Sequence, residues 1–321
     1  MRNYIIRRLL LMIPTLFIVS LVIFLLIRLI PGSIVDAMIG QQEAISGGGI
    51  HVDRAAIEEA LGLDLPMLTQ YGRWMGGIIL HGDLGNSLWR DTSVLEELAA
   101  RWPVTVELGL LGLIIGQLIA LPIGVYSALR QDTWGDYVGR SFAIACIAIP
   151  GFWVGTLIVV FPSLWWGYSP PLILIPFFED PIGNLGMFIL PAIVLGMAMA
   201  GETMRMTRTM MLEVLRQDYI RTAWAKGLRE RVIVIRHALK NALIPVITIV
   251  GLWMPVMIGG TVIIEQIFNL PGVGRLFLDA TLLRDYPVVS GVAFVFGFGM
   301  VFINLMVDIT YGFLDPRVHY R

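Results

Sequence analysis

Residues 9–30 read LLLMIPTLFIVSLVIFLLIRLI, an apolar run in which Arg28 is the single charged residue. A helix that crosses a bilayer needs about 20 mainly apolar residues. Further stretches pass the same test at 104–128, 138–162, 187–208, 241–264 and 288–312. The whole chain is 57% hydrophobic and 15% charged, whereas charged residues make up about 25% of a typical soluble domain. We therefore expect an all-α polytopic membrane protein with six transmembrane helices.

Lysine and arginine are distributed unevenly over the connections between these spans. Of the 23 basic residues, 16 lie in the N-terminal tail, the loop after the second span, the segment 205–240 and the C-terminal tail. Cytoplasmic loops carry the excess of positive charge, so both termini and the segment 205–240 are expected in the cytoplasm. The first span is too long for a signal peptide and has no small-residue cleavage site, which favours an uncleaved anchor.

The spans divide the chain into regions. We expect an N-terminal tail and first span at 1–30, an external cap at 31–103, a core of five helices at 104–312 and a cytoplasmic tail at 313–321. The core contains a basic cytoplasmic segment at 209–240.

The external connections contain strong turn signals. In the cap, the pattern predicts a short helix at 54–61 closed by Gly62 and another helix opened by Pro66. The cap is too small to fold alone, and we expect it to lie on the membrane domain. The prolines of the loop 163–186 oppose a regular helix, and the loop 265–287 predicts a short helix at 275–283 on the outer surface.

The segment 218–228, DYIRTAWAKGL, combines an apolar stripe with a basic face. If it is helical, the spacing places Tyr219, Ala223 and Gly227 in one row and Ile220, Trp224 and Leu228 in the next. A helix lying flat on anionic lipid, a solvated loop and a docking helix for a partner all fit this pattern. The small residues in the stripe permit close backbone approach, which favours a groove on a partner protein.

Several short motifs are distributed along the chain. They are RRL at 7–9, LGLDLP at 61–66, HGDLGNS at 81–87, LPAIVLG at 190–196, DYIRTA at 218–223, HALKNALIP at 237–245, FNLPGVGR at 268–275 and RDYPV at 284–288.

In these motifs the whole chain resembles the permease subunits of bacterial ABC importers for peptides, opines and nickel. Within that family it is most similar to the B-type subunits of dipeptide and oligopeptide permeases. The resemblance implies a type I importer fold in the inner or cytoplasmic membrane of a bacterium or archaeon. It also implies partners: a homologous second permease, two cytoplasmic ABC ATPases and an extracytoplasmic solute-binding protein.

The resemblance further implies that the segment 218–228 is the coupling helix that contacts the ATPases. The family's Glu-Ala-Ala positions fall at Arg221, Thr222 and Ala223, so arginine replaces the acidic residue. The residues expected to take part in coupling are Asp218, Tyr219, Arg221, Thr222, Ala223, Trp224, Lys226 and Gly227.

Neither lysine of the chain, Lys226 or Lys240, stands in a Gly-x-x-x-x-Gly-Lys-Ser/Thr phosphate loop. We therefore expect no cofactor in this chain, with ATP and Mg bound by the partner ATPases. The four histidines are scattered and no motif of an enzyme or a metal site is found, so we expect a non-catalytic subunit.

Polar and flexible residues inside the spans indicate candidates for the translocation path. Gln117 and Asn304 lie deep in apolar runs and either line a path or hold helices together. Met254 and Met257 lie on an adaptable face of the fifth span, and we assign all four residues to the path. Glu202 is expected to pair with Arg205, three residues further on. Prolines at 122, 150, 191 and 255 predict bends.

The function that the resemblance implies is ATP-driven import of short peptides. Permeases with similar motifs also import glutathione, nickel chelates, opines or oligosaccharides. In another class, a stand-alone secondary transporter would be expected to have repeated halves, and no obvious repeat is present.

Overall fold

A computed structural model describes residues 2–29, 35–36, 39, 54–60, 62–171 and 173–314 of the 321-residue chain. Over these residues it contains helices and one isolated bridge, between Asn86 and Ser93, but no strand. The predicted tail at 313–321 lies almost entirely outside the described residues. The helices are α1 (Arg2–Leu29), α3 (Arg54–Ala60), α4 (Met67–Gly76), α5 (Val94–Leu129), α6 (Trp134–Ala148), α7 (Gly151–Trp166), α8 (Pro181–Leu215), α9 (Asp218–Ala225), α10 (Glu230–Val232), α11 (Lys240–Ile267), α12 (Val273–Leu282) and α13 (Tyr286–Leu314). Two π-helical turns, η1 (Gly77–His81) and η2 (Ile233–Leu239), extend α4 and lead into α11.

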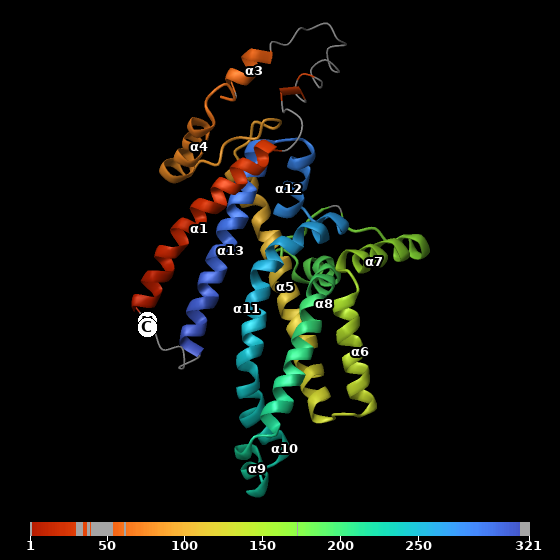
Figure 1. Ribbon diagram of the computed structural model, residues 1–321. Coiled ribbons are helices and arrows are strands. Elements are labelled where there is room, and N and C mark those ends of the chain that lie inside the picture. The colour runs from red at the N-terminus through yellow and green to blue at the C-terminus, as the bar shows by residue number, and fades with distance from the viewer. Residues whose placement is uncertain are drawn as a thin grey trace.

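The long helices stand side by side, with α9 and α10 at one end of the molecule and α3 and α4 at the other (Figure 1). Five described helices or continuous helical segments are long and apolar enough to cross a membrane, and the pair α6 and α7 gives a sixth if it is counted as one span. The six predicted spans are therefore recovered, five of them as single crossings.

The third predicted span, 138–162, is not one straight helix. Its two halves, α6 and α7, meet at an angle of 94°, and α7 runs sideways from the upright helices (Figure 1). Ile149 and Pro150 are both extended at the break. Proline has no N–H to donate and disfavours helix in the residue before it, so the bend predicted at Pro150 is a full change of direction. By contrast, Pro122, Pro191 and Pro255 stay inside continuous helices.

The core forms where α5 and α8 touch backbone to backbone. A Cβ atom on Gly196 would lie 2.4 Å from the carbonyl oxygen of Gly112, and one on Gly116 would lie 2.6 Å from Met199 Cε. Small residues recur at every fourth position of α5, at Gly112, Gly116, Ala120 and Gly124, and all are buried. Such spacing lets membrane helices approach closely.

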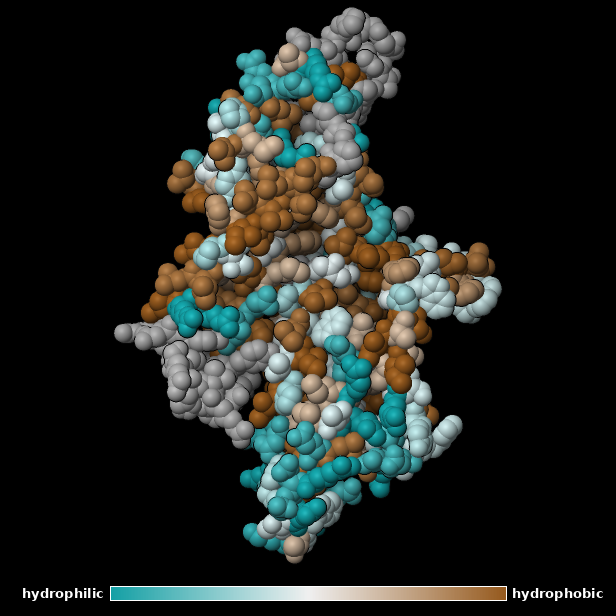
Figure 2. Space-filling model, viewed as in Figure 1, coloured by the Kyte–Doolittle hydropathy of each residue, from teal (hydrophilic) through white to brown (hydrophobic). Residues whose placement is uncertain are grey.

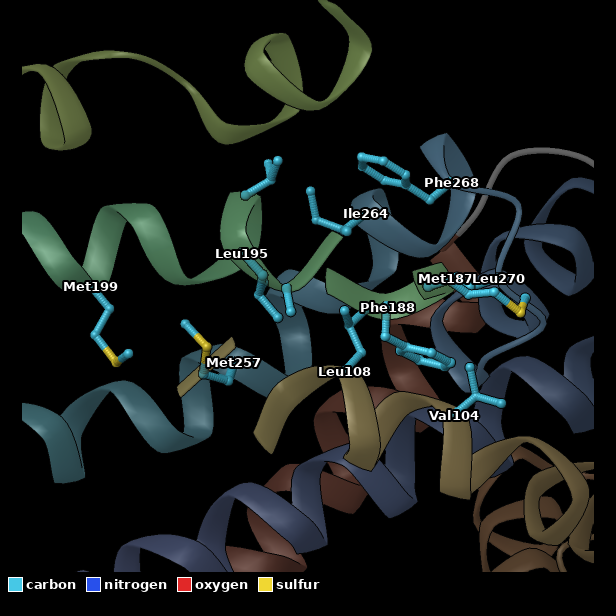
Figure 3. Packing of buried hydrophobic residues seen from close by; sticks show 12 residues of the cluster. Val104, Leu108, Met187, Phe188, Leu195, Met199, Met257, Ile264, Phe268 and Leu270 are labelled. Carbon is cyan, nitrogen blue, oxygen red and sulfur yellow. The ribbon is translucent and has the colours of Figure 1, made fainter. Parts of the chain in front are cut away.

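Larger apolar side chains pack around this contact. Phe188 and Met199 from α8 and Leu108 from α5 are fully buried, together with Met257 and Ile264 from α11 (Figure 3). These three helices therefore form the centre of the molecule.

The external cap is fixed to the membrane helices through α4. The hydroxyl groups of Tyr71 and Ser20 are 2.8 Å apart. The Tyr71 ring contacts Phe24 of α1, and Trp74 contacts Phe294 of α13, with centroids 5.4 and 5.9 Å apart. Helix α4 thus lies on α1 and α13, and the position of residues 31–103 outside the membrane stays a prediction.

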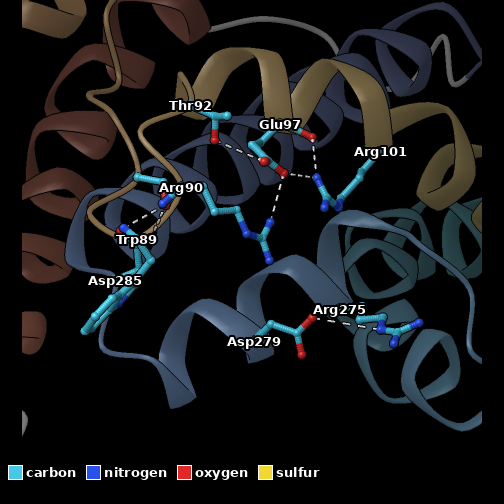
Figure 4. A network of polar contacts seen from close by, with 9 residues as sticks. Trp89, Arg90, Thr92, Glu97, Arg101, Arg275, Asp279 and Asp285 are labelled. Carbon is cyan, nitrogen blue, oxygen red and sulfur yellow. Dashed lines mark hydrogen bonds and ion pairs between the residues drawn. The ribbon is translucent and has the colours of Figure 1, made fainter. Parts of the chain in front are cut away.

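The turn before α5 provides a second attachment. Ser87 donates a hydrogen bond to the buried carboxylate of Asp285, and the Trp89 indole donates to the Leu283 carbonyl at 2.8 Å. Glu97 on the first turns of α5 pairs with Arg90 and Arg101 (Figure 4). Because α5 begins at Val94, the second membrane helix extends ten residues before the predicted span.

Of the two remaining loops that were predicted to be external, 163–186 differs from its prediction and 265–287 agrees with it. Pro181 begins α8 instead of opposing a helix, because its missing N–H is not needed at the first position. The Asp180 side chain accepts hydrogen bonds from the next free N–H groups, those of Ile182 and Gly183. The short helix predicted at 275–283 is confirmed as α12.

Hydrophobic surface covers the middle of the molecule, while hydrophilic atoms gather around α9 and α10 and around α3 (Figure 2). Exposed apolar side chains are frequent on α1, α6 and α7. This distribution is expected for a protein whose middle lies in lipid.

Candidate functional site

The segment predicted to dock a partner forms a separate helix, α9, at the end of the molecule opposite α3 and α4 (Figure 1). Its inner face consists of Ile220 and Ala223, which are 0% and 7% exposed. They pack against Met211 of α8 and Ile233 and Ala238 of η2. The helix is therefore mounted on the ends of the membrane helices by an apolar cluster of its own chain.

The C-terminal end of α9 is fixed by Gly227, whose φ is +74°. The Gly227 N–H donates to the Trp224 carbonyl at 2.9 Å, and the Leu228 N–H donates to the Ala223 carbonyl at 3.3 Å. This pair of bonds is the Schellman arrangement that ends many helices, and it favours glycine in the left-handed conformation. The turn predicted at Gly227 is confirmed.

Tyr219 ties α9 to the next membrane helix. Its hydroxyl accepts a hydrogen bond from the Asn241 side chain at 2.8 Å and donates to the His237 carbonyl at 3.3 Å. Both partners belong to the HALKNALIP motif, which spans η2 and the start of α11. These hydrogen bonds connect α9 to η2 and to the first turn of α11.

The outer face of α9 is exposed in the part of the chain that the structure describes. Asp218 and Arg221 are 96% and 74% exposed and form an ion pair at 3.3 Å. Trp224 is 48% exposed, and Thr222 and Lys226 are also exposed.

The prediction that the apolar residues of the segment 218–228 form a single stripe is wrong in one respect. Ile220 and Ala223 face inward while Tyr219, Trp224 and Leu228 are exposed, because the cluster under α9 covers only a narrow part of the helix. The small side chain of Ala223 serves packing within the chain and does not open a groove for a partner.

The four residues assigned to the translocation path are not brought together within the chain. Gln117 donates to Thr203 Oγ1 at 3.5 Å between α5 and α8, and Met257 is buried in the core while Met254 is half-buried. Asn304 is exposed on α13. None of the four lines the cavity of about 420 Å³ beneath α4 or the cavity of about 340 Å³ beside α6.

The ion pair expected between Glu202 and Arg205 is absent among the described contacts. Glu202 instead accepts a hydrogen bond from the Trp253 indole at 2.7 Å, which links α8 to α11. Arg205 is exposed and lines a cavity beside α6. A bond across helices thus replaces the predicted local pair.

A buried carboxylate that the sequence did not single out holds the end of α11 to α12. Glu265 is 0% exposed. It accepts hydrogen bonds from the Thr105 hydroxyl at 2.7 Å and the Arg275 N–H at 2.9 Å. The Thr105 oxygen in turn accepts from the Val273 N–H at 2.8 Å. The free N–H groups at the start of α12 are thereby satisfied.

The sequence feature that could have indicated this buried carboxylate is the pair of glycines in the FNLPGVGR motif. A Cβ atom on Gly272 would lie 2.2 Å from the Glu265 carboxyl carbon, and one on Gly274 would lie 2.5 Å from Val262 Cα. Only glycine leaves room for the carboxylate.

A second missed pair lies near α9. Asp136 at the start of α6 is 0% exposed and binds Arg208 of α8 through two hydrogen bonds of 2.7 Å. It also accepts from Ser127 at the end of α5 and from the Asp132 N–H. This carboxylate joins three membrane helices directly above the cluster that supports α9.

Comparison with known proteins identifies the family. A sequence model described as "Binding-protein-dependent transport system inner membrane component" matches residues 120–320, and a model of the corresponding N-terminal region matches residues 1–109. The chain belongs to this family of inner-membrane transport components. Its fold is therefore that of an ABC importer permease, and its location is the membrane.

Named relatives cover the full length of the chain. A protein of Brucella suis biovar 1 that carries the name of a peptide transport system permease protein is 42% identical over 323 residues, with 100% of both chains covered. The dipeptide transport system permease protein DppB of Escherichia coli K12 is 37% identical over 345 residues, and the glutathione transport system permease protein GsiC of Pectobacterium atrosepticum is 36% identical over 324 residues. Each is also covered completely.

Proposed function

We propose that this chain is the permease subunit of an ATP-driven importer of short peptides. It forms the translocation path with a second, homologous permease and receives cargo from an external solute-binding protein. Two cytoplasmic ATPases bind below it and hydrolyse ATP, so the chain itself is not catalytic.

The observation that carries the proposal is that α9 has one face fixed to its own chain and one face exposed. Its inner face is fixed to α8 and η2 by Ile220 and Ala223, while Asp218, Arg221 and Trp224 remain exposed. A helix that is rigid on one side and free on the other can transmit the movement of a partner. We assign contact with the ATPases to these exposed residues together with Thr222 and Lys226, and assign positioning of the helix to Tyr219, Ala223 and Gly227.

The orientation follows from charge. The segment that carries α9 has nine lysine and arginine residues between 205 and 240, and such segments stay in the cytoplasm. Arg8 of α1 pairs with Asp308 of α13 at 2.9 Å, so the N-terminal end of α1 and the C-terminal end of α13 lie together. We place both termini in the cytoplasm with α9.

The translocation path needs the second permease. Asn304 presents an exposed amide on an apolar helix, and such a group in a membrane commonly faces another helix or a water-filled path. We propose that Asn304 and Met254 face the path directly, while Gln117 and Met257 support the helices that line it.

The cargo is proposed from the relatives, whose names specify peptides, a dipeptide and glutathione. Glutathione is itself a small peptide. The common chemistry is a short chain with charged ends and amide bonds.

The test is uptake by proteoliposomes that contain this chain, its partner permease, both ATPases and the binding protein. We expect accumulation of a labelled dipeptide when ATP is enclosed with the ATPases, and no accumulation when the ATPases are omitted or ATP is replaced by a non-hydrolysable analogue. Glutathione as a competitor separates the two cargoes. Uptake by this chain alone, driven by an ion gradient, would overturn the proposal in favour of a secondary transporter.

A further inference from the structure

The cavity beside α6 is not explained by the proposed transport function. It has a volume of about 340 Å³ and opens between α5, α6 and α8. Residues that line it include Arg140, Arg205 and Arg208 together with Ile123, Ile144 and Ile147. Three arginines, one from α6 and two from α8, thus meet a mainly apolar cavity.

Two of the three arginines are free to bind a ligand. Arg208 is neutralised by its two hydrogen bonds to Asp136. Arg140 and Arg205 are exposed and take part in no ion pair among the described residues. Arg140 lies over the Tyr137 ring at 5.7 Å, a contact that leaves its charge in place. The cavity therefore carries two positive charges that this part of the chain does not balance.

The apolar side of the cavity continues onto the membrane surface. Ile144 and Ile147 are 63% and 42% exposed, and Phe142 on the same helix is 40% exposed. Arg140 lies six residues after the start of α6, which at 1.5 Å per residue is about 9 Å along the helix. The hydrophilic surface rises from α9 and α10 along α8 and α6 (Figure 2). Arg140 thus lies near the end of α6 on the side of this hydrophilic surface, where headgroups would meet a membrane helix.

Two glycines that line the cavity lie where the helices approach closely. A Cβ atom on Gly124 would lie 2.8 Å from Thr207 Cβ, and one on Gly139 would lie 3.2 Å from Ile123 Cγ2. The helices therefore approach closely below the cavity and leave its volume open between the arginines. The cavity volume lies in the range of small-ligand sites, roughly 300 to 1,000 Å³. It fits a phospholipid headgroup with its glycerol.

We propose that this cavity binds one anionic phospholipid, with the phosphodiester between Arg140 and Arg205 and the acyl chains along Ile144 and Ile147. Basic pockets between membrane helices bind anionic headgroups in this way. The lipid would brace α6 against α8 beside the Asp136–Arg208 pair, near the mounting of α9. The inference uses only the membrane location of the chain and is independent of its cargo and of its coupling to ATPases.

The test is native mass spectrometry of the full-length chain titrated with phosphatidylglycerol or phosphatidylcholine of the same acyl chains. We expect one phosphatidylglycerol per chain to bind roughly tenfold or more in preference to phosphatidylcholine, since two basic residues contribute. The double variant Arg140→Gln/Arg205→Gln should lose this preference. Arg140→Lys/Arg205→Lys should keep most of it, which guards against a loss caused by misfolding.

The control is Arg130→Gln, which removes an exposed arginine at the end of α5 that does not line the cavity. It should bind as the unaltered chain does. Inorganic phosphate added at millimolar concentration should not displace the lipid, because it lacks the apolar contacts. An unchanged preference in the double glutamine variant, equal binding of both lipids, or displacement by phosphate would each refute the site. None of these results depends on ATP or peptide, so the proposed function would stand.

Discussion

Gly272 is the residue whose replacement has the clearest expected consequence. Its position against the Glu265 carboxyl group leaves no room for a Cβ atom, and overpacking of this kind costs typically about 1–3 kcal/mol. We expect Gly272→Ala to lower the free energy of unfolding by that amount, measured by chemical denaturation in detergent micelles. Gly259→Ala is the matched control, because a Cβ atom on this helical glycine meets no neighbour. It should be neutral or stabilising, and equal effects of the two changes would contradict the account.

The Asp136–Arg208 pair gives a second prediction at this scale. Asp136→Asn leaves the largely buried Arg208 without its counter-charge and should destabilise the chain by about 3 kcal/mol. The double variant Asp136→Leu/Arg208→Met removes both charges and should recover much of this loss. The same denaturation experiment on the single and double variants measures the coupling. Additive losses would mean that the pair does not act as a unit.

Single residues also show where sequence reasoning stops. Glu202 and Arg205 have helical spacing, yet Trp253 from another helix binds Glu202. Glu265 lies at the end of an apolar run, and its donors are a backbone N–H ten residues away and the distant Thr105 hydroxyl. Such partners depend on tertiary contacts that periodicity does not contain. By contrast, the roles of Gly62 and Gly227 at helix ends were predictable, because glycine is the usual residue after a helix end. Both glycines have a positive φ in the structure.

Among the secondary-structure elements, α9 gives the most direct functional prediction. Trp224→Ala should reduce peptide-stimulated ATP hydrolysis by the assembled importer tenfold or more, because it removes exposed surface from the proposed contact. The thermal unfolding midpoint of the chain should not change, since Trp224 lies outside the buried cluster under α9. Trp134→Ala is the control. Trp134 is 82% exposed at the start of α6, and its loss should leave the stimulation intact.

If Trp224→Ala retained full stimulation while Ile220→Ala abolished it, the outer face would not be the contact surface. The loss in Ile220→Ala would then reflect only the mounting of the helix. Unchanged stimulation in both variants would remove α9 from the coupling mechanism altogether.

The presence and the approximate ends of most helices could be predicted from the sequence. The break of α6 and α7 was visible in Pro150, but the 94° change of direction was not, because a proline also stays inside α5, α8 and α11 without ending them. Whether a proline kinks or ends a helix depends on the neighbours that replace the lost hydrogen bond. The division of α9 into two faces likewise depends on what packs beneath it.

For the whole molecule, the hydrophobic pattern determined the membrane class and the number of apolar segments. It could not determine the translocation path. Gln117 and Met257 are engaged within this chain while Asn304 is exposed, and a path between two permeases requires the second chain.

The central claim is that the free face of α9 meets a cytoplasmic ATPase. The most direct measurement is photocross-linking in the assembled importer, with a benzophenone amino acid placed at position 224 or, as the inward-facing control, at position 220. We predict an adduct between this chain and an ATPase subunit from position 224, and only cross-links within the chain from position 220. Adducts from position 224 with lipid or with the external binding protein, and none with an ATPase, would contradict the account.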